Sequence, residues 1–204
     1  MGKASEISPQ IRSVALIALG SNQPSAKGDA GAAVQMGVQF LVEKYKAIRA
    51  VSPFYRTPAF PSGSGPDFVN AVVAIETADA PEKVIATLHG IEEKMGRTRE
   101  IRWGPRILDL DLIALGGHVL PDRATHAVWR DLSLEEQMQR APDRLILPHP
   151  RVQDRAFVLV PLANVAPDWV HPVLGQSVAK MLAALPAGAK EEVVALSSDS
   201  SGIS

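Results

Sequence analysis

Residues 47–76 read AIRAVSPFYRTPAFPSGSGPDFVNAVVAIE, and this stretch decides the fold class. Residues 47–55 and 68–76 are rich in β-branched and aromatic residues, which favours strands. Residues 57–66 hold prolines, glycines and serines at a density typical of a loop. Two strands separated only by a loop pair as antiparallel neighbours, because a parallel crossover needs a longer connection, usually a helix. The stretch therefore predicts an antiparallel pair.

Strand and helix patterns alternate on both sides of this pair. Apolar runs and helical spacing predict strands at 14–19 and 107–115 and helices at 29–45 and 81–95. Pro81 suits the first turn of the second helix, and Gly96 suits its end. We therefore predict an α+β fold, a mainly antiparallel sheet with helices packed on it, and not a doubly wound parallel sheet.

The length of 204 residues suits a single domain with a substantial core. We expect an N-terminal extension over 1–13, the domain proper over 14–188 and a disordered tail over 189–204. Residues 121–143 are polar apart from an amphipathic segment at 132–138, so we expect an insertion outside the core.

Composition excludes several classes of protein. The net charge of −1 gives no overall basic field for nucleic acid or anionic lipid, so a polyanion site would need a local group of arginines. The absence of cysteine excludes disulfides and thiolate metal sites and fits a reducing compartment. No segment has the length of a signal peptide or a membrane span. We expect a cytoplasmic protein with neither nucleic acid nor membrane as its partner.

Residues 96–111, GRTREIRWGPRILDLD, carry the chemistry. Four arginines lie close together in a chain that is otherwise nearly neutral: Arg97, Arg99, Arg102 and Arg106. Guanidinium groups donate paired hydrogen bonds to phosphate oxygens, so a glycine-flanked loop of this kind suits a polyphosphate chain. A solvated basic loop is the alternative reading of the arginines alone.

Asp109 and Asp111 favour the polyphosphate-binding interpretation of the arginines over a solvated basic loop. On a strand they point to one face, since successive side chains alternate. Mg²⁺ takes one or two carboxylates together with phosphate oxygens, so arginines and aspartates side by side suit a nucleoside triphosphate with its metal. The Gly20-Ser21-Asn22-Gln23 turn lacks the Gly-Lys-Ser/Thr ending of a P-loop, so side chains and metals would have to hold the nucleotide.

Residues 102–111, RWGPRILDLD, resemble the signature of the 6-hydroxymethyl-7,8-dihydropterin pyrophosphokinase family. Four further blocks resemble that family in the same order: ALGSN at 18–22, SPFYRTP at 52–58, DFVN at 67–70, and LPHP at 147–150 followed by DRAF at 154–157. The resemblance spans roughly residues 14 to 172, and an ordered set of this size is far more specific than one short motif.

The resemblance implies a ferredoxin-like fold and the transfer of the pyrophosphoryl group of ATP to a hydroxymethyl pterin in folate biosynthesis, with release of AMP. It implies ATP as co-substrate and two Mg²⁺ ions, held by Asp109 and Asp111. The implied ATP-binding residues are Glu92, Arg97, Arg99, Arg102, Trp103, Arg106, His149 and Arg155. The implied pterin-binding residues are Thr57, Pro58, Phe68, Asn70, Trp103, Asp109 and Phe157. The implied catalytic residues are Arg99, Arg102, Asp109 and Asp111.

The side chains of the implied pterin-binding residues suit a flat heterocycle. Phe68 and Asn70 share a strand face, so a flat ring could stack on the phenyl group while the amide binds its edge, with Phe157 on the other side. Plain core packing is the alternative for each aromatic residue taken alone. We also expect the loops over 57–66 and 96–104 to be mobile until both substrates bind.

Two other functions remain open from the residues alone. A sheet bearing aromatic residues beside an arginine loop could bind unpaired RNA, although the neutral charge and the lack of an RNA-recognition signature argue against it. A two-metal nucleotidyltransferase could use the same aspartates, but it would release pyrophosphate. The oligomeric state and a contact of Arg144 with ATP stay open.

Overall fold

The computed structural model of the chain describes residues 12–24, 28–59, 65–96 and 107–197. The strands are β1 (Ser13–Ser21), β2 (Ile48–Val51), β3 (Tyr55–Thr57), β4 (Phe68–Thr77), β5 (Asp109–Leu115) and β6 (Val194–Ala195). The helices are α1 (Ala30–Tyr45), α2 (Pro81–Lys94), α3 (Arg123–Arg130), α4 (Leu134–Gln139), α5 (Ala156–Val165), α6 (Val178–Ala184) and α7 (Ala187–Glu191), with a 3₁₀ turn at Val152–Asp154.

Within the described residues the six strands form one sheet in the order β5-β1-β4-β3-β6, with β2 also beside β4. Every strand pairing is antiparallel. The chain order β1-α1-β2/β3-β4-α2-β5 is that of the ferredoxin-like βαββαβ unit. The α+β class and the antiparallel pairing predicted for the segments at 47–55 and 68–76 are thus confirmed.

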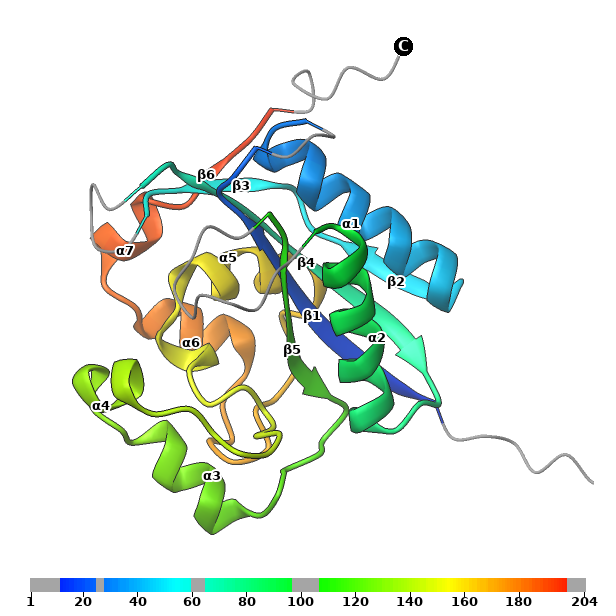
Figure 1. Cartoon of the computed structure of the whole chain (residues 1–204). Coiled ribbons are helices and arrows are strands. Elements are labelled where there is room, and N and C mark those ends of the chain that lie inside the picture. Colours follow the sequence, from blue (N-terminus) through cyan, green and yellow to red (C-terminus); the bar gives the residue numbers. More distant parts are fainter. Residues whose placement is uncertain (1–11, 25–27, 60–64, 97–106, 198–204) are drawn as a thin grey trace, which may run out of the picture.

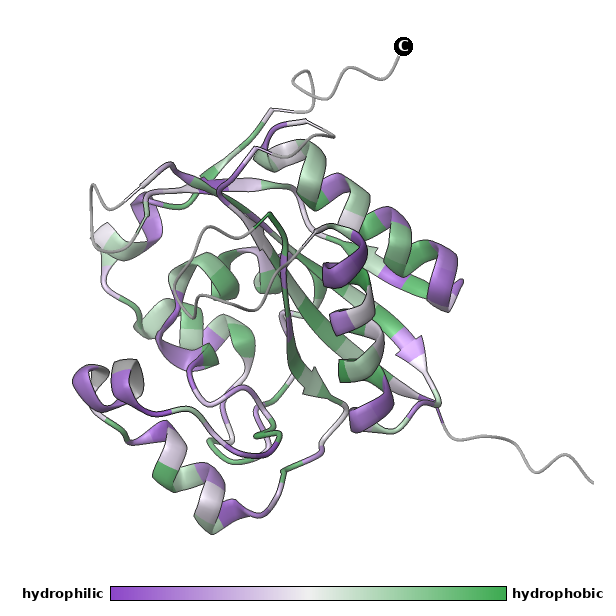
Figure 2. Ribbon diagram, in the orientation of Figure 1, coloured by the Kyte–Doolittle hydropathy of each residue, from purple (hydrophilic) through white to green (hydrophobic). Residues whose placement is uncertain are grey.

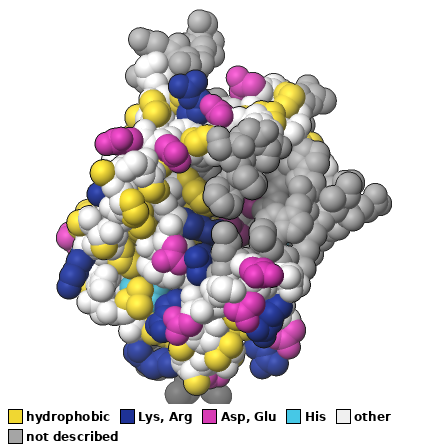
Figure 3. Space-filling model, turned by 90° about the vertical axis from the view of Figure 1, so that its left-hand side faces the viewer, with side chains coloured by type: hydrophobic (Ala, Val, Ile, Leu, Met, Phe, Trp, Pro, Cys, Tyr) yellow, Lys and Arg dark blue, Asp and Glu magenta, His cyan; other side chains and the backbone are white. Residues whose placement is uncertain are grey.

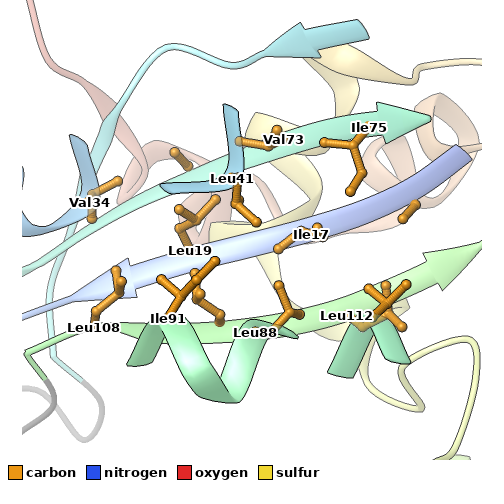
Figure 4. Close-up of a cluster of buried hydrophobic side chains, with 14 of the residues drawn as sticks. Ile17, Leu19, Val34, Leu41, Val73, Ile75, Leu88, Ile91, Leu108 and Leu112 are labelled. Atoms are coloured by element: carbon orange, nitrogen blue, oxygen red, sulfur yellow. The ribbon is translucent and has the colours of Figure 1, made fainter. Parts of the chain in front are cut away.

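Helices cover both faces of the sheet, as Figure 1 shows. On one face α1 and α2 pack against alternate residues of β1, β4 and β5, which include Ile17, Val73 and Leu112 (Figure 4). On the other face Leu16 and Val72 pack with α5 and α6. This two-sided burial explains the continuous apolar runs of the central strands (Figure 2).

Helix boundaries follow local signals in the sequence. The Asp29 carboxylate accepts a hydrogen bond from the backbone N–H of Ala32 at 2.9 Å and so caps α1. Pro81 is the first residue of α2, where its missing N–H costs nothing. Asp122 caps α3 in the same way as Asp29 caps α1.

The strand predicted over 47–55 is wrong as a single element. It breaks into β2 and β3 at Ser52 and Pro53, because a proline has no N–H for the ladder. Ser52 covers the break: its hydroxyl accepts from the N–H of Val72 at 3.0 Å and donates to the carbonyl of Pro53 at 2.7 Å. Strand β3 then runs to Thr57, which the prediction placed at the start of the loop.

The tail expected from residue 189 also needs a correction over its described part. Helix α7 reaches Glu191, and β6 pairs with β3 through the partners Tyr55 and Ala195. Residues 198–204 lie outside the described part of the chain.

The insertion at 121–143 forms α3 and α4, which lie apart from the sheet in Figure 1 and are largely hydrophilic in Figure 2.

Candidate active site

Asn70, Gly20 and Asp109 lie side by side across three neighbouring strands. Gly20 of β1 is the partner of Asn70 in β4 and of Asp109 in β5. Directly opposed residues of an antiparallel sheet point to one face, and Val72, two residues after Asn70, belongs to the core under α5 and α6. The row therefore faces the α5 side of the sheet.

The residues of β1 that lie opposite the two carboxylates are small. Gly20 stands opposite Asp109, and Ala18 stands opposite Asp111. Both aspartates are half-buried at the start of β5, two residues apart and therefore on one face. A side chain at Gly20 would meet Asn70, since an added Cβ would lie 3.1 Å from Asn70 Oδ1.

Glu92 of α2 contacts the backbone of β5, the strand that carries Asp109 and Asp111. Its side chain on α2 is 1% exposed, and its Oε1 accepts a hydrogen bond from the backbone N–H of Leu110 at 2.8 Å. Leu110 lies between Asp109 and Asp111, on an outer strand whose backbone groups need partners outside the sheet. The described contact of Glu92 is therefore with the strand that carries the aspartates, and its contact with ATP stays a prediction.

Three of the predicted pterin residues lie together on β3 and β4. Thr57 is the strand partner of Phe68, and Tyr55 is the partner of Asn70. The Asn70 amide donates from Nδ2 to Thr57 Oγ1 at 2.8 Å, and both side chains are 6% exposed. This bond fixes the amide, so Oδ1 is the atom that faces Gly20.

His149 begins a second group of predicted residues on the segment before α5. Its backbone N–H donates to the carbonyl of Ile113 in β5 at 2.8 Å, which ties the segment to the acidic strand. Burial lowers the pKa of His149 to about 3, and the Arg155 charge acts in the same direction while Asp109 opposes it. The ring is therefore neutral near pH 7. Because Nδ1 accepts from the N–H of Arg151 at 3.1 Å, the ring proton is on Nε2.

Arg155 and Phe157 lie at the start of α5. The Arg155 guanidinium is 5.6 Å from the centre of the Phe157 ring, a cation–π distance, and Phe157 is 40% exposed. Phe157 is therefore a surface residue and belongs to neither of the two buried hydrophobic clusters. Pro58 follows β3 and is exposed.

Five predicted residues lie outside the described part of the chain: Arg97, Arg99, Arg102, Trp103 and Arg106. The mobility predicted for the loops at 57–66 and 96–104 stays a prediction, since residues 60–64 and 97–104 also lie outside the described part of the chain. Arg144, whose role the sequence left open, is exposed and pairs with Asp143 at 3.1 Å.

Sequence reasoning missed two residues at or beside the site. Gly20 was quoted within a motif, but only the strand register reveals that it separates Asn70 from Asp109. His126 belongs to the segment set aside as a polar insertion, yet it is fully buried. A Pro-Asp start at Pro121 and Asp122 signals the helix that carries it, but nothing in the sequence signals which face packs inward.

The described residues limit which ligands and surroundings the site can have. They contain no group of three or more His, Asp or Glu side chains that could hold a metal by themselves, so the remaining ligands of any ion would come from elsewhere. None of the described helices is both long and apolar enough to span a bilayer. Figure 3 shows acidic and basic side chains interspersed over one face, with no broad area of one sign among the coloured atoms.

The fold and the site together define a class. This is an α+β protein whose antiparallel sheet presents two carboxylates and an oriented amide at one end, beside a neutral histidine and an arginine. Carboxylates suit a hard cation, and the two nitrogen donors suit an anionic substrate.

Comparison with known proteins narrows this class to one family. Residues 16–167 match the profile of 7,8-dihydro-6-hydroxymethylpterin-pyrophosphokinase (HPPK). The 2-amino-4-hydroxy-6-hydroxymethyldihydropteridine pyrophosphokinase of Synechocystis sp. is 35% identical over 175 residues, which is 85% of this chain and 77% of that protein. The protein of the same name from Methylorubrum extorquens is 38% identical over 181 residues, 88% of this chain and 98% of that protein. The chain belongs to the HPPK family.

A solved structure shares the fold. The Plasmodium falciparum HPPK-DHPS A437G protein with SDX-DHP aligns over 87% of this chain with a TM-score of 0.61 and 16% identity. This chain spans 46% of that longer chain, less than half its length.

Proposed function

We propose that the chain transfers the pyrophosphoryl group of ATP to 6-hydroxymethyl-7,8-dihydropterin in folate biosynthesis, giving the pterin diphosphate and AMP. The observation that carries the proposal is the row formed by Asn70, Gly20 and Asp109, in which the amide proposed to bind the pterin lies beside a carboxylate proposed to bind the metal. The two substrates have to meet at such a boundary, because the hydroxymethyl oxygen must approach the β-phosphorus in line.

Asp109 and Asp111 are the proposed ligands of Mg²⁺, with two ions expected. The donor set fits, since two half-buried carboxylates on one face supply the oxygen ligands that Mg²⁺ takes from a protein, and phosphate and water complete the shell. When bound, the metal would neutralise charge on the phosphates during transfer. The small residues Ala18 and Gly20 leave room for a phosphate chain in front of these carboxylates.

His149, Arg155 and Glu92 are the described members of the proposed ATP set, which also includes Arg97, Arg99, Arg102, Trp103 and Arg106. The neutral His149 ring would donate from Nε2 to an oxygen or nitrogen acceptor of the nucleotide. Arg155 would pair with phosphate oxygens, as guanidinium groups commonly do. We assign Glu92 an indirect part, through its hydrogen bond to the backbone N–H of Leu110.

Thr57, Asn70, Phe68 and Phe157 are the described core of the proposed pterin set, completed by Pro58, Trp103 and Asp109. Thr57 fixes the Asn70 amide, which leaves Oδ1 to accept a hydrogen bond from the pterin edge. The exposed ring of Phe157 and the half-buried ring of Phe68 would stack on the flat heterocycle.

The reaction would proceed by positioning and charge neutralisation. The hydroxymethyl oxygen forms a bond to the β-phosphorus while the bond from that phosphorus to the α-phosphate oxygen breaks, and AMP leaves. Arg99 and Arg102 are the proposed catalytic cations beside Asp109 and Asp111. The absence of cysteine is consistent with the cytoplasm as the proposed location.

Product analysis tests the proposal. The protein is incubated with ATP, Mg²⁺ and the reduced hydroxymethyl pterin, and the nucleotide products are separated. AMP formed only when the pterin is present supports a pyrophosphokinase. Pyrophosphate with a nucleotidylated product would indicate the nucleotidyltransferase, and salt-dependent RNA binding without turnover would indicate an RNA-binding module.

A further inference from the structure

A buried histidine of the α3 insertion contacts the backbone next to His149. His126 is 0% exposed, and its Nε2 lies 3.0 Å from the carbonyl oxygen of Pro148. A carbonyl only accepts, so Nε2 carries the proton and donates. Pro148 immediately precedes His149, so this bond fixes the peptide group that leads into a proposed ATP-binding residue.

The same segment is held at two more points, one by Leu120 just before the insertion and one by the insertion itself. Leu120 and Leu147 form an antiparallel bridge with backbone bonds of 2.9 and 3.2 Å. Arg151 Nη1 lies 3.4 Å from the carbonyl of Arg130 and 3.5 Å from that of Leu132. The last two contacts are long and weak, so His126 makes the shortest of the side-chain bonds described between the insertion and residues 147–151.

The orientation of the His126 ring is itself fixed. His171 is also 0% exposed and packs edge-on against it, with ring centroids 5.6 Å apart. His171 Nδ1 accepts from the N–H groups of Val173 and Leu174 at 3.2 Å each, which anchors the second ring. Burial lowers the pKa of His126, so the neutral donor form is the one present near pH 7.

We infer that His126 is a positioning residue for the nucleotide site, acting through the Pro148 carbonyl on the orientation of His149. The inference rests on the proposed function, in which His149 binds ATP. It gives the insertion a role in the reaction: α3 contacts residues 147–151, which are also bound to β5 through the His149 N–H and the Ile113 carbonyl. A purely structural His126 would contribute to stability and leave nucleotide affinity unchanged.

Substitutions at position 126 separate these two roles. Gln places an amide nitrogen near the position of imidazole Nε2, whereas the shorter Asn does not reach the carbonyl. His126→Ala and His126→Asn are expected to weaken binding of an ATP analogue with a methylene bridge between the α and β phosphates by roughly tenfold, because a buried acceptor loses its partner. His126→Gln is expected to restore binding to near the wild-type level. His118→Ala removes an exposed histidine of the same connection and serves as the control.

Calorimetry on the full chain measures the dissociation constants of the protein for the ATP analogue with Mg²⁺ and for the pterin. Amide exchange at His149 and Arg151 is measured on the same proteins. Selective loss of nucleotide affinity in the Ala and Asn variants, with faster exchange at His149 and recovery in the Gln variant, supports the inference. Equal nucleotide affinity of the Gln and Asn variants overturns the inference, and so do equal losses of nucleotide and pterin affinity. The comparison of Gln with Asn decides even if the Ala variant does not fold. A wild-type protein that does not bind the analogue refutes the proposed function instead, while exchange at His149 still reports whether His126 orders the segment.

Discussion

The side-chain amide of Asn70 donates from Nδ2 to Thr57 Oγ1 at 2.8 Å, inside the pairing of β3 and β4. The bond is buried, so water does not compete for it, and the amide has one orientation before any ligand arrives. A group oriented in advance loses little entropy when it binds a substrate. With Nδ2 held by Thr57, Oδ1 is the atom that Asn70 would offer to a pterin in the proposed function.

Gly20→Ala should disturb that orientation. The new methyl group would lie 3.1 Å from Asn70 Oδ1, closer than ordinary van der Waals contact, so the amide must shift. We expect pterin affinity to fall about fivefold through one weakened hydrogen bond, with nucleotide affinity little changed. Calorimetric titration with each ligand measures this. Gly117→Ala is the control, because nothing lies within 4 Å of its added Cβ. Unchanged pterin affinity would place the pterin away from Asn70.

Asp109→Asn and Asp111→Asn should each lower the turnover rate by at least about a hundredfold, since each removes a charged ligand from a site that neutralises phosphate charge. Both side chains are half-buried at the start of β5, so the free energy of unfolding should change little. Steady-state kinetics with Mg²⁺, beside a urea unfolding curve, checks both statements. Asp79→Asn, at the N-terminal side of α2, tests for a nonspecific charge effect. Normal turnover in either variant would contradict the metal assignment.

Stability should fall as the pH drops from about 7 toward 4. Burial lowers the pKa of His126, and it lowers that of His171 to about 4. The unfolded chain takes up protons on these rings below about pH 6.5, whereas the folded protein does not, so acid favours unfolding. Above pH 7 both states are neutral at these rings and the effect is absent.

His171→Asn isolates this contribution. Asn can still accept from the N–H groups of Val173 and Leu174 but does not titrate. Urea unfolding at several pH values between 7.5 and 4.5 should give a shallower loss of stability than in the wild type. Val128→Ala, at an exposed site without a titratable group, should keep the wild-type slope. An identical slope in the His171 variant would show that its ring does not resist protonation.

Two helix glycines should respond to alanine with opposite signs. Nothing lies within 4 Å of a Cβ added at Gly90 in α2, so Gly90→Ala should stabilise by about 0.5–1 kcal/mol through backbone entropy. A Cβ at Gly37 in α1 would lie 2.9 Å from Leu108 Cδ2 in a packed core, so Gly37→Ala should destabilise by about 1–3 kcal/mol. Thermal unfolding of the pair measures both. The same sign for both variants would refute the packing argument.

The sequence predicts the fold well where the signal is local. Apolar runs, the Asp29 cap and Pro81 mark β1, β4, β5, α1 and α2 within one or two residues, whereas α5, α6 and α7 were not predicted. The break at Ser52 was missed because the Ser52 hydroxyl, and not a backbone carbonyl, accepts from the N–H of Val72, and this bond depends on a partner 20 residues away. Strand β6 was missed because its two residues gain their conformation only from pairing with β3.

The site residues also divide into those with a local sequence signal and those whose position depends on distant partners. Spacing alone places Asp109 and Asp111 on one face, and the resemblance supplies the remaining residues. The neighbourhood of Gly20, Asn70 and Asp109 follows from the register of three strands, which no local pattern encodes. The burial of His126 depends in the same way on His171, which is distant in sequence.

The short strand β6 bears on how this protein can be shortened or fused. A chain cut at residue 188, the domain end that the sequence suggests, would lose the partner of β3 and leave an open sheet edge next to Thr57. Open edges recruit strands from other molecules, so the shortened protein would be prone to self-association through the strand that presents Thr57. A tag joined after residue 197 would leave this protective strand in place.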